Sequence, residues 1–197
     1  MPRTEEVYQQ IRDERREQIL RTAAEVFARK GIASTRINDL AEAAGVSQGL
    51  LYRYFANREE MFAALLERLV QETIRQMHSA LEHLGTPWEQ LHWLTGQLLL
   101  GMYEQPNFIP LFSQAPALSG RVPGMLSELG TAFSTVLRQL IVAGQAAGQV
   151  IERDPEQLVL LYLCCLQGLA AGMTFYGENL VAHFPDADAV LQLFKPC

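Results

Sequence analysis

Cysteine is scarce in this chain of 197 residues, which carries an adjacent pair, Cys164 and Cys165, and a third copy at Cys197. Adjacent cysteines rarely pair with each other because the ring that they would close is strained. The three cysteines therefore do not indicate a disulfide framework, and a reducing cytoplasm is the expected compartment. The first residues are charged and lack the apolar core of a signal peptide.

Signatures of enzymes are also missing from the sequence. It contains no glycine-rich phosphate loop, no GxSxG and no HExxH. The four histidines stand at spacings that do not build a metal site. We therefore predict that the protein is not an enzyme and that it holds no metal or cofactor.

Long uninterrupted apolar runs are absent as well. The most apolar stretch, residues 158–173, is short and contains Gln167, so we expect a buried helix there and no membrane span. The alternation of apolar and polar residues that is typical of strands does not appear either. These absences predict an all-α protein, and the helical periodicity and start signals described below indicate about nine helices.

Positive charge is not in excess, since the net charge is −6. Its distribution is uneven, however. Residues 1–60 contain 10 Lys or Arg and 10 Asp or Glu, so the whole net charge arises from the remainder of the chain. Residues 43–58 contain two arginines and no acidic residue. A basic tip on a neutral segment is typical of a protein that docks one end onto phosphates.

The stretch Thr35–Arg58 carries a pattern that is typical of a helix-turn-helix. Thr35 and Ser47 are expected to cap two short helices, and Gly45 stands where the turn needs a positive φ. The third helix is expected at about 48–54. Small or apolar residues occupy the positions where the two helices would cross: Leu40, Ala41, Ala44, Val46, Leu51 and Tyr54. An ordinary helical hairpin is the alternative interpretation.

Helical periodicity and start signals predict the other elements. Residues 9–30 repeat apolar residues at Ile19, Ala23 and Phe27. Asn57 with Glu60, and Thr86 with Glu89, resemble capping boxes that open two further helices. Other helices are predicted at 107–118, 124–147, 155–177 and 186–194.

The segment TRINDLAEAAGVSQGLLYRYFANREEMFAALL, together with the AAEVFARKGIASTR ending of the preceding helix, strongly resembles the tetracycline-repressor (TetR) family of bacterial transcriptional regulators. The resemblance covers about residues 15–66. It implies a helix-turn-helix DNA-binding domain at 1–56 and a ligand-binding, dimerisation domain at 57–197. The family's members are usually repressors that a small molecule releases from a DNA operator.

The resemblance assigns DNA contacts to individual residues of this chain. Gln48 and Arg53 are expected to contact bases, although Arg53 could instead pair with a phosphate. Of Tyr54 and Phe55, at least one is expected in the core. Arg58 stands where the family usually has lysine and is expected to contact phosphate. The full set of predicted DNA-binding residues is Thr35, Arg36, Ser47, Gln48, Gly49, Tyr52, Arg53, Tyr54 and Arg58.

Two such DNA-binding domains are needed to read a palindrome, so a homodimer is expected. The last two long helices are the candidates for its interface, through Leu160, Leu163, Gly168, Ala171 and Gly172. Internal core is the alternative for these residues.

Large side chains concentrate between residues 88 and 133, and through the resemblance they line an apolar pocket for a small-molecule inducer. Core packing is the alternative for each of them. They are Trp88, Trp93, Met102, Tyr103, Phe108, Phe112, Met125 and Phe133.

Two other functions compete with a repressor of this kind. One is a DNA-binding redox sensor that uses Cys164 and Cys165. Their apolar surroundings in the sequence are expected to make both thiols inert. The other is a helical protein-interaction module that does not bind DNA.

Overall fold

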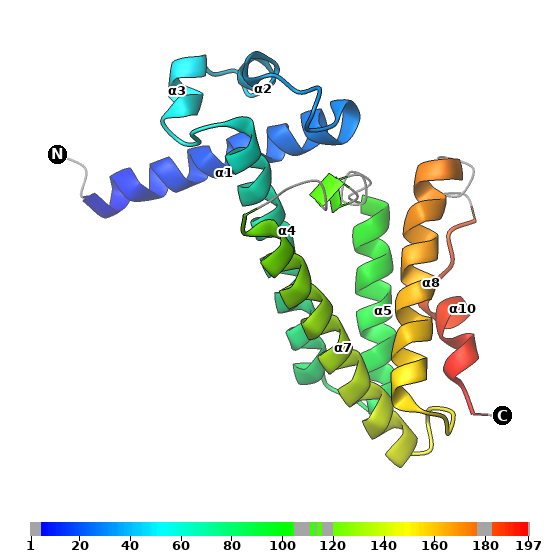
Figure 1. Cartoon of the computed structure of the whole chain (residues 1–197). Helices are drawn as coiled ribbons and strands as arrows, with labels where there is room; N and C mark the ends of the chain where they lie inside the picture. The colour runs from blue at the N-terminus through cyan, green and yellow to red at the C-terminus, as the bar shows by residue number, and fades with distance from the viewer. Residues whose placement is uncertain (1–4, 105–110, 113, 116–119, 177–182, 197) are drawn as a thin grey trace. The chain divides into compact units, whose positions relative to one another are not determined.

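The computed structural model describes residues 5–104, 111–112, 114–115, 120–176 and 183–196, and every regular element among them is helical (Figure 1). The all-α class is therefore confirmed. The predicted helical piece at 107–118 falls largely outside the described residues. The elements are α1 (Glu5–Lys30), α2 (Ile37–Ala43), α3 (Gln48–Tyr52), α4 (Arg58–Glu82), α5 (Pro87–Glu104), α7 (Val122–Ala146), α8 (Pro155–Tyr176), α10 (Ala187–Leu191) and the 3-10 helix η2 (Gln192–Phe194).

The chain divides into two compact units. Residues 1–69 and 110–123 form the first, which we call the head, and residues 70–109 and 124–197 form the second, which we call the body. The border between them falls inside α4. The predicted functional boundary after residue 56 stands just before α4 begins, and it remains a prediction.

Local capping signals set where two of the helices begin. The Asn57 side chain accepts a hydrogen bond from the Glu60 amide at 2.7 Å, before the first turn of α4. At the start of α5, the Glu89 amide donates to the Thr86 hydroxyl at 3.3 Å, and the Thr86 amide donates to the Glu89 carboxylate at 2.7 Å. These hydrogen bonds hold the pKa of Glu89 below its ordinary value. Both predicted helix starts are confirmed, but only Thr86 and Glu89 form the reciprocal capping box, since the Glu60 carboxylate accepts from the Ala56 amide at 2.7 Å.

The core of the head forms along one face of α1. Ile19, Leu20, Ala23 and Phe27 are all buried, as the periodicity predicted. The Phe27 ring meets the Phe62 ring of α4 edge to face, with 5.0 Å between the ring centroids. Such pairs add to the free energy of burial because the positive edge of one ring faces the negative face of the other. This core anchors α1 and the start of α4 within the head.

The core of the body is one apolar cluster shared by its helices. The 3-10 helix at the end of the chain joins it, because Phe194 is buried there and its carbonyl accepts a hydrogen bond from the Ile151 amide at 2.9 Å. The cluster draws on α5 through Leu91 and Leu94, on α7 through Leu137 and Ile141, on α8 through Leu158 and Tyr162, and on α10 through Leu191.

A buried pair of hydroxyls links α5 to α8 inside this cluster. The Thr95 hydroxyl donates to the Leu91 carbonyl at 2.7 Å, and it lies 2.8 Å from the Tyr162 hydroxyl. Since Thr95 has one hydroxyl proton, Tyr162 must be the donor between the two. Burial raises the pKa of Tyr162 well above its ordinary value.

Conservative substitutions of Tyr162 and Thr95 should destabilise the protein by different amounts. Tyr162→Phe leaves Thr95 bonded to Leu91 and should lower the free energy of unfolding by about 1 kcal/mol. Thr95→Val leaves the buried Tyr162 hydroxyl without its acceptor and should lower the free energy of unfolding by more, up to about 3 kcal/mol. Urea unfolding of both variants and the double variant measures this. Equal losses in the two single variants would contradict the assignment of the donor.

Candidate DNA interface

The turn between α2 and α3 follows the expected geometry. Gly45 has a φ of 62°, a left-handed conformation that side chains with a Cβ rarely adopt. The Val46 amide donates to the Ala41 carbonyl at 3.0 Å, which folds the chain back over α2. Ser47 then caps α3 by accepting from the Leu50 amide at 3.2 Å. Ala41 is buried at the crossing, so the predicted crossing residue is confirmed.

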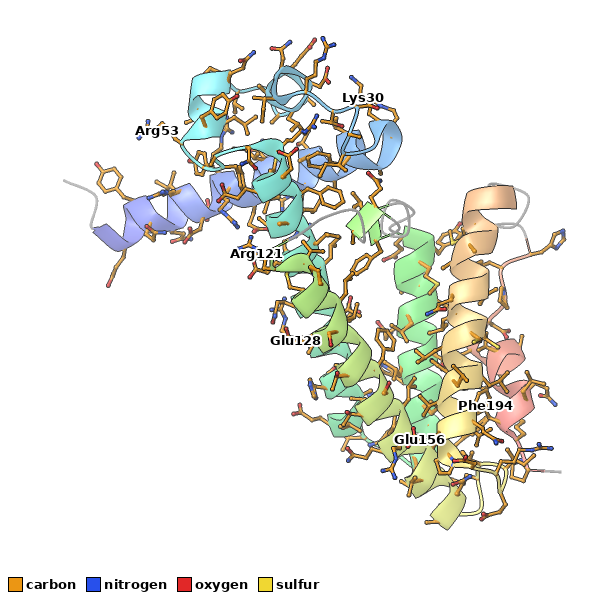
Figure 2. All side chains as sticks on the ribbon, in the orientation of Figure 1. Lys30, Arg53, Arg121, Glu128, Glu156 and Phe194 are labelled. Carbon is orange, nitrogen blue, oxygen red and sulfur yellow. The ribbon has the colours of Figure 1, made fainter. Side chains whose placement is uncertain are left out.

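Six of the nine predicted DNA-binding residues are exposed on this motif. Arg36 is the N-cap of α2, and Arg53 is the C-cap of α3. Figure 2 labels Arg53 at that end of the helix. Together the six offer guanidinium groups, a hydroxyl, an amide, a phenol and bare backbone, which are the groups that contact bases and phosphates in DNA. They are Arg36, Ser47, Gln48, Gly49, Tyr52 and Arg53.

Positive charge in the head is less neutralised than its composition suggests. In the described part of the chain, seven of the eleven Lys and Arg side chains of the head lack a carboxylate within ion-pair distance, against one of four in the body. Arg36 and Arg53 belong to the seven. Their guanidinium groups are thus available to phosphates or bases.

Asp39, an acidic residue on α2, forms an ion pair with Lys30 and a hydrogen bond with the backbone of Arg36. The Asp39 carboxylate accepts from the Arg36 amide at 2.9 Å and pairs with Lys30 at 3.0 Å. The backbone hydrogen bond from Arg36 and the Lys30 ammonium lower the pKa of Asp39. The carboxylate therefore stays ionised and caps α2, while its charge is offset by Lys30.

Thr35 does not cap α2, so that expectation was wrong. The N-cap is Arg36. Thr35 is fully buried, and its hydroxyl donates to the Gly31 carbonyl at 2.7 Å. That carbonyl is available because α1 ends at Lys30. The hydrogen bond from a side chain at the start of α2 is instead made by Asp39, whose carboxylate accepts from the Arg36 amide.

Arg58 is engaged inside the head. Its Nη1 donates to the carbonyls of Ala33 at 3.1 Å and Thr35 at 2.8 Å, and its Nε donates to Glu59 at 2.7 Å. It therefore ties the loop before α2 to the start of α4. A cation at this position can support the DNA-binding surface without touching DNA.

Tyr54 and Phe55, the two aromatic residues after α3, differ in burial. Phe55 is buried, and the Arg16 guanidinium lies over its ring, 5.1 Å from the centroid. Tyr54 is half-buried. Phe55 is thus the core member of the pair, and Tyr54 keeps part of its ring and hydroxyl accessible.

Two amide side chains were missed by the sequence analysis. Asn38 on α2 accepts a hydrogen bond from Gln48 on α3 at 2.8 Å. Gln114 accepts from the Ile32 amide at 2.7 Å and donates to the Phe27 carbonyl at 3.4 Å, which closes the end of α1. The second contact joins residues more than 80 positions apart, so no local signal could have indicated it.

The predicted pocket residues are only partly brought together. Four half-buried ones pack against the core of the body: Trp88, Trp93, Met102 and Phe133. Trp93 stacks on His83, and Lys195 lies over the Trp88 ring. Met125 is buried, whereas Tyr103 is 53% exposed. Phe112 belongs to the head, and Phe108 lies outside the described residues.

The predicted dimer residues lie on a helix that its own chain leaves largely uncovered. Leu160 is 63% exposed, and Gly168 and Ala171 are exposed too. Leu163 and Gly172 are half-buried. Residues 155–173 of α8 are long and apolar enough to cross a membrane, yet only 22% of this window is buried. The expectation of a buried helix therefore holds for one face only: Leu158, Val159, Tyr162 and Leu166 are buried, whereas the face that carries Leu160 is exposed.

The cysteines on α8 also differ from expectation. Both are free thiols, but Cys164 is exposed and Cys165 is half-buried. Their apolar sequence neighbours do not bury them, because such neighbours along a helix bury a residue only if another surface covers that face.

Comparisons with known proteins agree with this geometry. The profile described as "Bacterial regulatory proteins, tetR family" matches residues 19–65. The chain is 33% identical over 96 residues to the "Uncharacterized HTH-type transcriptional regulator YfiR" of Bacillus subtilis (strain 168). That alignment spans 49% of this chain and 46% of the relative, so it covers about half of each protein.

A second relative aligns over nearly the whole chain. It is the "Probable acrEF/envCD operon repressor" of Escherichia coli (strain K12), 34% identical over 92% of this chain and 87% of that protein. Among solved structures, the transcriptional regulator FadR from Bacillus subtilis in complex with stearoyl-CoA has a TM-score of 0.71. It is 20% identical and covers 90% of this chain and 96% of that chain, a likeness that shows the fold alone.

Replacing Arg58 should show whether this residue stabilises the loop before α2 or contacts DNA. Arg58→Ala removes three hydrogen bonds within the head and should lower the free energy of unfolding by about 1–3 kcal/mol. Arg58→Lys should recover only part of this, because an ammonium cannot reproduce the planar fork. The salt dependence of binding to a DNA duplex should keep its slope in both variants. A slope lower by about 1 in Arg58→Ala, with stability unchanged, would instead identify a phosphate contact.

Proposed function

Because this chain belongs to the TetR family of bacterial transcriptional regulators, we propose that it is a repressor that binds a palindromic DNA operator as a homodimer. In this proposal a small apolar molecule binds the body and releases the protein from DNA. The observation that carries it is the exposed face of the helix-turn-helix, where polar and cationic side chains gather on α3 and at the N-cap of α2. We place its action in the cytoplasm, where the DNA is.

Base reading is assigned to α3. An α-helix fits the major groove of B-DNA, where each base pair presents its own set of donors and acceptors. The Gln48 amide suits adenine and the Arg53 guanidinium suits guanine. Both side chains are exposed, and Arg53 has no ion-pair partner among the described residues that would compete with a base.

Phosphate binding is assigned to groups around α3. Arg36 at the start of α2 and the Tyr52 hydroxyl are exposed and can contact the backbone on either side of the groove. Ser47 and the Gly49 backbone allow close approach at the N-terminus of α3. Such contacts set the register of the protein on DNA but carry no sequence information.

The dimer interface is assigned to α8 with α7. Leu160, Cys164, Gly168 and Ala171 recur at helical spacing and form an exposed, apolar and mostly small stripe. A second copy of the chain is the occupant that suits it, because a two-fold axis brings the same stripe onto itself. The ion pair between Arg138 of α7 and Glu156 of α8, at 2.6 Å, is exposed and suits the polar rim of such an interface.

The inducer site is assigned to the body. Half-buried aromatic and methionine side chains pack against its core, and such adaptable side chains are typical of sites for apolar molecules. FadR from Bacillus subtilis, which shares this fold, holds stearoyl-CoA, and by analogy we propose a ligand with a long apolar part. We propose that the ligand shifts the population between two spacings of the paired heads.

Substitution of Arg53 tests base reading. Arg53→Ala should relax sequence preference at one base position, because a bidentate arginine contributes about 1–3 kcal/mol of discrimination against the wrong base. Arg36→Ala is the matched control. It removes an exposed arginine of the same motif and should weaken binding to all duplexes about equally. Sequencing of duplexes selected from a random library measures both. Unchanged preference in Arg53→Ala would contradict the assignment.

Substitution of Leu160 tests the dimer. Leu160→Glu should weaken dimerisation by more than about 2 kcal/mol, or about thirtyfold in Kd, because it places a charge in an apolar interface. Gln192→Glu adds the same charge at an exposed site on η2 and should have no effect. Sedimentation equilibrium measures the mass of each variant. A wild-type monomer, or an unaffected dimer in Leu160→Glu, would exclude this interface.

A further inference from the structure

The Gln48 side chain is held by a second helix. Its Nε2 donates to the Asn38 Oδ1 at 2.8 Å. Gln48 is the first residue of α3, and Asn38 is the second residue of α2. Both are exposed. The bond therefore spans the turn of the helix-turn-helix, on the surface that is assigned to DNA.

The backbone under this bond is anchored by buried side chains and by a helix cap. Leu40 on α2 and Leu51 on α3 are buried on the inner side of the two helices. Ser47 fixes the first turn of α3 through the Leu50 amide. The Cα atoms of residues 38 and 48 are therefore held in place. On this fixed backbone, a glutamine side chain without a partner could still rotate about its three side-chain torsions, and the last of them, which turns the amide, has two broad, roughly opposite minima.

The hydrogen bond removes that freedom. A primary amide has two N–H donors on its nitrogen and two lone pairs on its oxygen. With one N–H given to Asn38, Gln48 keeps one N–H and its carbonyl oxygen for a ligand. One donor beside one acceptor matches the N7 acceptor and N6 donor of adenine. Guanine presents two acceptors at the same edge and cannot use the amide oxygen.

We propose that Asn38 is a positioning residue that sets the base preference of Gln48, so that this chain selects adenine at the position that α3 reads first. The inference rests on the proposed DNA-binding function and names a residue that acts through another. Asn38 itself needs no contact with DNA for this role. An exposed hydrogen bond between two side chains contributes little to folding, so a stabilising role does not explain the pair.

Three substitutions separate the possibilities. Asn38→Ala removes the acceptor and lets the amide rotate. Asn38→Asp keeps an acceptor and cannot donate, so it holds the Gln48 amide in the same orientation while adding a negative charge. Gln48→Ala removes the reading group. Glu42→Ala is the control, since it truncates an exposed polar residue one turn further along α2.

The probe is a library of random-sequence duplexes, from which each full-length variant selects bound molecules for sequencing. In the wild type, adenine should be preferred over guanine at one position of each half-site by about five- to 150-fold. Asn38→Ala should lose most of this preference at that position alone. Asn38→Asp should retain it, with weaker binding to all duplexes because its charge repels phosphates. Glu42→Ala should keep the preference. Thermal unfolding should be nearly unchanged in every variant.

Each contrary result has a distinct meaning. If the wild type selects a motif and Asn38→Ala selects the same motif with equal preference, Asn38 does not position Gln48. If Gln48→Ala also leaves the motif unchanged, Gln48 reads no base, and the inference fails while DNA binding stands. If the wild type selects no motif at all, the proposed function fails, and the inference fails with it.

Discussion

The turn between α2 and α3 depends on the left-handed backbone of Gly45 and on Ala41, a small residue that is buried where the helices cross. Leu40 and Leu51, on the two helices that this turn joins, are both buried in the core of the head. Once the crossing is set, the exposed residues of α3 and the N-cap of α2 face outward together. The positions of the proposed base-reading and phosphate-binding groups thus depend on the backbone of this turn. Their charges can contact DNA only because the turn holds them on one exposed surface.

Much of this frame could be predicted because its signals are local. Ser47, Asn57 and Thr86 act on amides within three residues, so their roles can be read from spacing alone. The contacts that could not be predicted join residues far apart in the sequence or depend on which of several nearby groups makes a hydrogen bond. Thr35 was expected to be the N-cap of α2, but the N-cap is Arg36, and its amide donates to the Asp39 carboxylate. Arg58 turns inward because the loop before α2 presents two carbonyls to it.

In the body, periodicity located the helices but could not tell which faces are covered. The apolar sequence of α8 indicated burial, yet Leu160 and Cys164 are exposed. The same composition that suggests a core helix also suits a surface covered by a second copy. This exposed stripe supports the pairing of two heads on a palindrome. DNA reading and dimerisation therefore form one hypothesis. In it, the head provides the sequence preference, and the body forms the dimer that brings a second head to the DNA.

The most direct test of this account measures how many wild-type chains bind one duplex and how that binding responds to salt. Duplexes selected by the protein from a random library would be titrated with it by native mass spectrometry, and affinities would be measured over a range of salt concentrations. The account predicts two chains per duplex and a steep linear fall of log K with log salt, because several phosphates are contacted. One chain per duplex, or an affinity that does not change with salt, would contradict it.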